Sequence, residues 1–192
     1  MAKDFTLIKY EEFLHAAIKA GYRLCSYENY IANPVGKVLI LRHDVDKKPG
    51  NSLKTAQLQH QLGVTGTYYF RAVPESYDEN VIRQIAELGH EIGYHYEDLT
   101  IFQGNVGQAK AHFDVWLEKL KQHYPIKTIC MHGSPTSKWD NRLLWETYDY
   151  KEMGLIGEPY FDLDFNRVFY ITDTGRRWDG NKVSVRDKVN SK

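Results

Sequence analysis

Two aspartates, Asp44 and Asp46, follow a short apolar segment at residues 38–41. Residues two positions apart in an extended chain point to the same side, so both carboxylates can face one site. One of them can bind a cation while the other accepts a proton from a water or a substrate. A capping aspartate in a solvated turn would produce the same pattern, so the pair alone does not decide between the two explanations.

Polar side chains also follow four further predicted strands. They are Arg71 after residues 65–70, His95 after residues 91–94, His132 after residues 128–131 and Asp173 after residues 168–172. Aspartate with two histidines is a typical ligand set for a catalytic zinc or a similar divalent ion, which acidifies a bound water and polarises a carbonyl. A carboxylate outside the ligand set would act as the base. The pattern therefore predicts metal-assisted hydrolysis of an amide or an ester.

The elements that position these side chains alternate along the chain. Apolar runs predict strands at 38–41, 65–70, 91–94, 128–131 and 168–172, and helical spacing predicts helices at 10–18, 49–62, 81–86 and 106–120, with a short one at 140–148. Residues 22–36 are predicted to be a link. The alternation implies right-handed crossovers and a mainly parallel α/β sheet, barrel-like or open, whose strands all end at the same edge. We expect an active site at that edge.

Composition limits the class of protein. The 192 residues suit a single domain, and 25 Lys and Arg balance 25 Asp and Glu, which argues against nucleic acid or an anionic membrane as the main partner. Cys25 and Cys130 are far apart and are expected to be reduced and buried. The first residues lack the apolar core of a secretory signal, and no run approaches the roughly 20 apolar residues of a membrane span. We expect a cytoplasmic protein, with its oligomeric state left open.

Two segments carry a resemblance: residues 41–46 read Leu-Arg-His-Asp-Val-Asp, and residues 89–95 read Gly-His-Glu-Ile-Gly-Tyr-His. They resemble the polysaccharide deacetylase superfamily, also called the NodB-homology or family 4 carbohydrate esterase group. The resemblance spans residues 36–135 and implies a distorted, incomplete (β/α) barrel of mainly parallel strands. It implies one domain over residues 1–192, with the usual last strands missing or reduced. It also implies removal of N-acetyl groups from amino sugars with one divalent ion, zinc first and cobalt, nickel or iron as alternatives.

The resemblance also implies residue roles. Asp44 is the catalytic base, and Asp46 and His95 bind the metal. The family usually places a second histidine four residues after the first, where this chain has Leu99. We expect His132 to complete the metal site.

Glu97 is the alternative third ligand, or a catalytic or substrate-orienting carboxylate. His90, which precedes its strand, is expected to be structural. Four further residues are predicted to contact substrate: His43, Arg71, Asp173 and Arg176. Arg176 beside Arg177 would suit the phosphate of a nucleotide-linked sugar, although a solvated loop is equally compatible with the pattern.

The favoured function is a metal-dependent hydrolase that removes an N-acetyl group from an amino sugar or from a sugar-nucleotide precursor of a surface polysaccharide. The alternative is an inactive deacetylase-like protein that binds a carbohydrate or a partner protein. Leu99 and the absence of the family's late histidine motif favour this alternative. The pair of carboxylates argues against it, because buried like charges are costly without a cation. Hydrolysis of a small non-sugar amide is a third option on the same scaffold.

Overall fold

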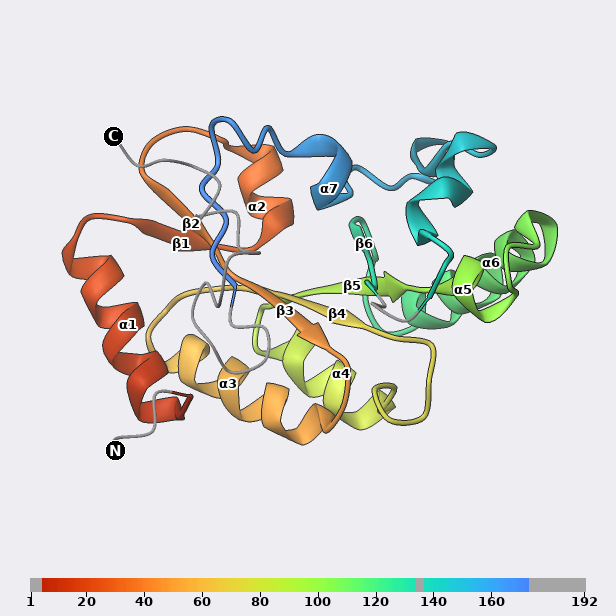
Figure 1. Ribbon diagram of the computed structural model, residues 1–192. Coiled ribbons are helices and arrows are strands. Elements are labelled where there is room, and N and C mark those ends of the chain that lie inside the picture. Colours follow the sequence, from red (N-terminus) through yellow and green to blue (C-terminus); the bar gives the residue numbers. More distant parts are fainter. Residues whose placement is uncertain (1–4, 134–136, 173–192) are drawn as a thin grey trace.

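Two parallel sheets form the centre of the protein. The computed structural model describes residues 5–133 and 137–172. One sheet pairs β1 (Arg23–Cys25) with β2 (Val38–Ile40), and the other contains, in spatial order, β3 (Arg42–Val45), β4 (Thr67–Phe70), β5 (Glu91–Tyr96) and β6 (Ile129–Met131). All of these pairs are parallel, which confirms the predicted α/β class. The four-stranded sheet curls into part of a barrel wall (Figure 1).

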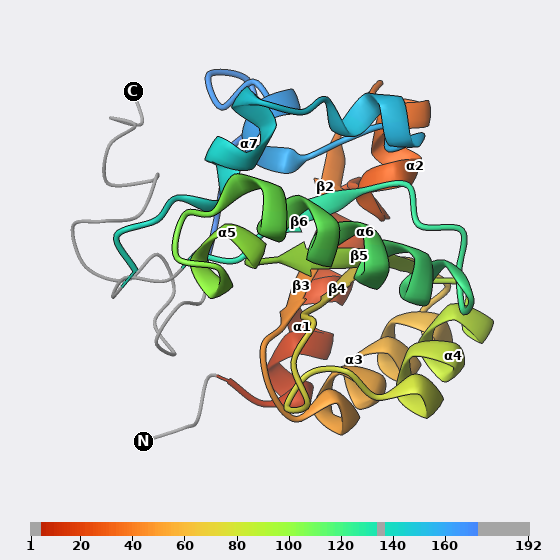
Figure 2. The same ribbon diagram turned by 90° about the vertical axis from the view of Figure 1, so that its right-hand side faces the viewer.

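Helices lie on both sides of the strands. They are α1 (Leu7–Lys19), α2 (Tyr27–Ala32), α3 (Pro49–Gln61), α4 (Glu79–Glu87), α5 (Asp98–Ile101), α6 (Val106–Lys121), α7 (Pro159–Asp162) and the 3-10 helices η1 (Asn141–Glu146) and η2 (Tyr150–Met153). In Figure 1, α3 and α4 lie on one side of the strands, and α2 and α7 lie on the other. Figure 2 shows α5 and α6 beside β5. Within the described residues, no helix has the length and apolar character needed to cross a membrane.

The first aspartate of the acidic segment lies inside a strand, and the second lies directly after it. The strand predicted at residues 38–41 ends at Ile40, and β3 begins at Arg42. Between them, Leu41 donates its N–H to the carbonyl of Cys25 at 3.0 Å, and its own carbonyl accepts from the N–H of Thr67 at 2.8 Å. One extended segment therefore belongs first to the small sheet and then to the large one. This places Asp44 within β3 of the large sheet and Asp46 just after the C-terminal end of that strand.

Two parts of the predicted element order are wrong. Residues 22–36 contain β1 and α2, where only a link was expected, because the three residues of β1 are held by pairing with β2 rather than by a local pattern. Residues 168–172 form no strand. The N–H groups of Arg167 and Val168 both donate to the carbonyl of Asp164 at 2.9 Å and close a turn there. Phe169 and Ile171, which follow this turn, are half exposed.

The larger hydrophobic core covers one face of the four-stranded sheet. Its strand residues are Val45, Tyr68, Phe70, Ile92, Tyr94, Tyr96 and Ile129, and they pack with apolar side chains of α3, α4 and α6. The start and the end of α4 are both fixed locally. Asp78 caps α4 through the N–H groups of Asn80 and Val81, and Gly89, at φ 85°, ends that helix and turns the chain into β5. A smaller cluster under α1 joins Leu14, Leu24, Leu41 and Val64.

Candidate metal centre

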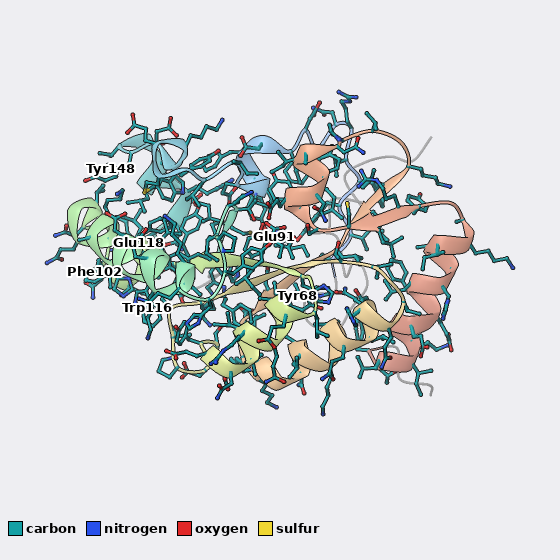
Figure 3. All side chains as sticks on the ribbon, turned by 180° about the vertical axis from the view of Figure 1, so that it is seen from behind. Tyr68, Glu91, Phe102, Trp116, Glu118 and Tyr148 are labelled. Carbon is teal, nitrogen blue, oxygen red and sulfur yellow. The ribbon has the colours of Figure 1, made fainter. Side chains whose placement is uncertain are left out.

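The other face of the four-stranded sheet is polar. Register partners in a parallel sheet project to the same side, and side chains alternate along each strand. The register pairs Arg42 with Thr67, and alternation along each strand then gives the side chains that project from this face. They are Arg42, Asp44, Thr67, Tyr69, Glu91, His95 and Cys130. In Figure 3, Glu91 of this face lies on the side of α2, whereas Tyr68 lies on the side of α3. The chemistry predicted from the sequence is therefore concentrated on one side of the sheet.

Three potential ligand atoms converge where β3, β5 and β6 end. Oδ1 of Asp46 lies 3.1 Å from Nδ1 of His132 and 3.7 Å from Nε2 of His95, and the two imidazole nitrogens are 3.2 Å apart. In a tetrahedral zinc site with bonds of about 2.0–2.1 Å, the ligand atoms are about 3.3 Å from one another. The observed separations bracket that value. The three side chains, here called the ligand trio, could hold one small divalent ion with a fourth position open.

The carboxylate of Asp46 supports this assignment. Its Oδ1 atom is buried and makes no well-formed hydrogen bond among the described residues, although Nδ1 of His132 lies 3.1 Å away. A buried carboxylate oxygen without a partner is costly. Burial acts to raise the pKa of Asp46, but the neighbouring His132 and His95 lower that pKa overall. An ionised oxygen facing two imidazoles fits a cation.

The backbone of β6 orients the imidazole of His95. Its Nδ1 lies 2.9 Å from the carbonyl oxygen of Cys130, so Nδ1–H donates there and the lone pair of Nε2 faces the other members of the trio. Burial lowers the pKa of His95, which favours the neutral ring. A neutral imidazole with a fixed tautomer is the form that binds a metal.

His132 is fixed by backbone hydrogen bonds on two sides. Its N–H donates to the carbonyl of Tyr96 at 2.8 Å, and its carbonyl accepts from Nδ2 of Asn141 at 3.0 Å. The buried Asn141 in turn accepts, through Oδ1, from the N–H of Thr100 at 2.9 Å. The residue after β6 is thereby tied to β5 and α5, which holds the imidazole beside His95.

Arg71 and Glu97 form an ion pair behind the ligand trio. Nε and Nη2 of Arg71 lie 2.7 and 2.6 Å from Oε1 of Glu97, and Nη1 of Arg71 donates to the carbonyl of Asp46 at 3.4 Å. The other carboxylate oxygen, Oε2, is 4.0 Å from Nε2 of His132. Glu97 therefore lies outside the trio, on the far side of the His132 ring. A carboxylate in that position can orient an imidazole ligand.

Asp44 lies beside the trio and is held by Arg42. Nε and Nη2 of Arg42 donate to the two carboxylate oxygens at 2.9 and 2.6 Å, and Oδ2 is 3.7 Å from Nε2 of His95. Burial alone would raise the pKa of Asp44, but His95 and the Arg42 guanidinium hold that pKa well below its usual range. Arg42 also donates to the hydroxyl of Tyr160 in α7 at 3.3 Å. The carboxylate of Asp44 is thus ionised and fixed in direction.

Two predicted positions face away from the trio. Nε2 of His43 is 2.7 Å from Nε2 of Gln59, and its ring stacks on Tyr68 with centroids 4.5 Å apart, on the apolar face of the sheet. His43 alternates with Asp44, so when one points into the site the other cannot. Leu99 is buried in the larger core, and the position where a second histidine was expected therefore lies in the apolar interior.

The remaining predicted residues divide into structural and undescribed ones. His90 is structural, as expected, because its Nδ1 accepts from the N–H of Gly66 at 3.1 Å and its Nε2 lies 2.9 Å from the carbonyl of Ala56. Asp173 and Arg176, predicted to contact substrate, lie outside the described residues.

Three residues of this region were not identified from the sequence. Arg42 shares the two-residue spacing that joins Asp44 to Asp46, and that spacing could have revealed its position. Cys130 lies two residues before His132, so the same alternation would have placed it on the polar face. Asn141 gave no comparable signal, because its contact with His132 depends on how η1 packs against α5.

Comparisons with known proteins found a similar solved structure and no match of the other kinds. No family model matches the chain, and no curated protein matches it. Among solved structures, the chain is similar to a family 4 carbohydrate esterase from Bacillus anthracis, with a TM-score of 0.48 and 19% sequence identity. The similarity covers 62% of this chain and 56% of that structure, so the chain spans little more than half of its length.

Proposed function

We propose that this protein is a metal-dependent hydrolase that removes the acetyl group from an N-acetylated amino sugar. The observation that carries the proposal is the convergence of Asp46, His95 and His132, with the ionised Asp44 beside them. The substrate class comes from the resemblance of residues 41–46 and 89–95 to the deacetylase superfamily. Within that class we favour a sugar-nucleotide precursor of a surface polysaccharide, used in the cytoplasm.

The ligand trio would hold the ion, zinc first and cobalt, nickel or iron as alternatives. When bound, such an ion supplies a polarised acyl carbonyl and an acidified water. Asp44 then accepts the proton of the attacking water, because Arg42 keeps its carboxylate ionised and directed. A carboxyl with a lowered pKa is a strong acid once protonated, so Asp44 can return that proton to the leaving nitrogen.

Glu97 and Arg71 support this site without entering the trio. Oε2 of Glu97 faces Nε2 of His132 from 4.0 Å, while Arg71 occupies Oε1 and reaches the backbone of Asp46. We therefore assign Glu97 to positioning rather than to proton transfer. Substrate contacts are left to Asp173 and Arg176, with Arg176 suited to a phosphate.

The first experiment measures the metal content of protein purified without chelator. We expect about one divalent ion per chain in the unmodified protein, and loss of the ion in Asp46→Ala. Asp114→Ala is the matched control, because its side chain is 47% exposed against 48% for Asp46 and lies on α6. Equal metal content in both variants would remove the trio as the metal site.

The second experiment measures acetate release from free and nucleotide-linked N-acetyl amino sugars. Asp44→Asn should keep the ion and lose about 10²–10⁴-fold in rate, the usual contribution of a general base. Full activity in this variant would remove Asp44 as the base.

The position of Leu99 in the core favours one competing function, a deacetylase-like protein that binds sugar without cleaving it. That function predicts that an N-acetylated oligosaccharide binds to the metal-loaded protein while no acetate is released with any of the four metals. Release of acetate that depends on Asp44 would exclude it.

A further inference from the structure

A second set of ligand atoms lies beside the trio. Asp44, His95 and Cys130 each offer one atom, and the three atoms lie within 4.8 Å of one another. Cys130 is the register partner of His95 on the neighbouring strand, so both side chains project from the polar face at the same level. Its thiol forms no disulfide, is fully buried and donates to the carbonyl of Met131 at 3.7 Å. The proposed hydrolase does not use this thiol.

The two sets share a single nitrogen atom. Nδ1 of His95 is engaged by the carbonyl of Cys130, so only Nε2 is available to an ion. Nε2 lies 3.7 Å from Oδ1 of Asp46 and also 3.7 Å from Oδ2 of Asp44. One imidazole lone pair binds one ion at a time. An ion in the second set would therefore exclude an ion from the trio.

The two sets also differ in chemical preference. Carboxylate and imidazole ligands suit zinc and similar borderline ions, whereas a thiolate selects soft ions. The set with Cys130 is the softer of the two, although both contain His95 and one aspartate.

We propose that Asp44, His95 and Cys130 form a second metal site, specific for thiophilic ions such as cadmium, which displaces the ion of the ligand trio. When the metal–sulfur bond forms, the thiol proton leaves to water and no electron is transferred. Oδ2 of Asp44 turns to the ion and gives up the Nη2 bond of Arg42, while Oδ1 keeps the Nε bond. The claim that cadmium displaces another ion rests on the proposed function of the trio. An ion in the second site would occupy Asp44, the proposed base, as well as His95, the ligand that both sites share.

The test is a titration of the full chain with cadmium. The signal measured is the ultraviolet charge-transfer absorption band of a cadmium–thiolate bond. The band should appear in the unmodified protein and be lost in Cys130→Ser. Cys25→Ser is the matched control, since Cys25 is the second free and buried cysteine, and the band should persist there. Cys130→Ala provides a second variant in case the serine hydroxyl disturbs folding, which a thermal melt would show.

Three outcomes would overturn the second site. They are a band that persists in both Cys130 variants, a band lost in Cys25→Ser instead, and cadmium bound to the unmodified protein without any band. In parallel, a zinc indicator measures zinc released from zinc-loaded protein. Cadmium should release about one zinc per chain from Cys25→Ser, and at least about tenfold more cadmium should be needed for the Cys130 variants.

The same measurements separate this proposal from the proposed function. Protein that binds no zinc but shows a cadmium band dependent on Cys130 would contradict the trio and keep the second site. Protein that binds zinc through Asp46 but shows no such band would contradict the second site and keep the trio.

Discussion

On the two central strands of the four-stranded sheet, the two faces are equally buried but chemically opposite. On β4 and β5 every residue is buried, whichever side it faces. One face carries apolar residues such as Phe70 and Ile129, which pack against helices, and the other carries Thr67, Glu91 and His95. Burial alone therefore does not identify the site. The two-residue alternation separates the core from the chemistry on the same strands.

The polar face itself has two levels. At the start of the strands, Oε2 of Glu91 accepts from the N–H of Glu28 at 2.8 Å and from the hydroxyl of Thr67 at 2.7 Å, and Thr128 donates to its other oxygen. At the end of the strands, Oδ1 of Asp46 has no such donor within the described chain. A satisfied carboxylate ties the fold together, and an unsatisfied one marks a place for a ligand.

The largest effect should follow from removing an imidazole from the polar face. His95→Ala should weaken metal binding beyond the about 10–100-fold expected for an outer-shell change, because a direct ligand is lost. His43→Ala is the control, since His43 neighbours Asp44 in sequence but faces the other side. Competition with a zinc indicator measures both dissociation constants. Equal weakening of metal binding in both variants would contradict the assignment of the metal site to the polar face alone.

The apolar face should control stability instead. Phe70 is fully buried in the larger core, so Phe70→Ala should lower the free energy of unfolding by about 3–5 kcal/mol through lost burial and a residual cavity. Urea unfolding measures that loss. The folded fraction of the variant should bind metal normally, and a selective loss of metal affinity in stable protein would contradict this assignment.

The buried carboxyl group of Glu158, which contacts β6, predicts that the stability of the protein depends on pH. Burial raises the pKa of Glu158, which accepts from the N–H of Met131, from an ordinary value of 4.5 to about 7. The folded state therefore holds a proton that the unfolded state has lost, and stability should fall as the pH rises from about 4.5 to 7, by at most about 3 kcal/mol. Urea unfolding at several pH values should show this fall, and Glu158→Gln should remove it. An unchanged slope in the variant would assign the effect to other groups.

The smallest effect should come from the ion pair behind the trio. Glu97→Gln should raise the dissociation constant for zinc by about 10–100-fold, because the negative charge that faces Nε2 of His132 is lost. In a His132→Ala background the same change should cost little, since the ring through which Glu97 acts is gone. Additive effects in this double-mutant cycle would show that Glu97 acts independently of His132. Glu118→Gln on α6, an exposed carboxylate, is the control.

The sequence predicted the strands that have long apolar runs, and it predicted which strand ends carry Asp46, His95 and His132. It could not predict β1, because three residues without periodicity become a strand only through pairing with β2. The run at residues 168–172 misled because strand-forming residue types do not by themselves make a strand, and this segment belongs to neither sheet of the described residues. Arg42 and Cys130 were overlooked because their importance depends on register across strands. Leu99 in the core could be seen only once α5 was placed.

The spatial order of β3, β4, β5 and β6 is also their order along the chain. Each strand can therefore dock onto the one made just before it as the polypeptide is synthesised, without waiting for a distant segment. In that sequence of events Asp46 is made first, His95 second and His132 last. The ion-binding site becomes complete only when β6 has docked, so capture of an ion would follow assembly of the sheet rather than nucleate it.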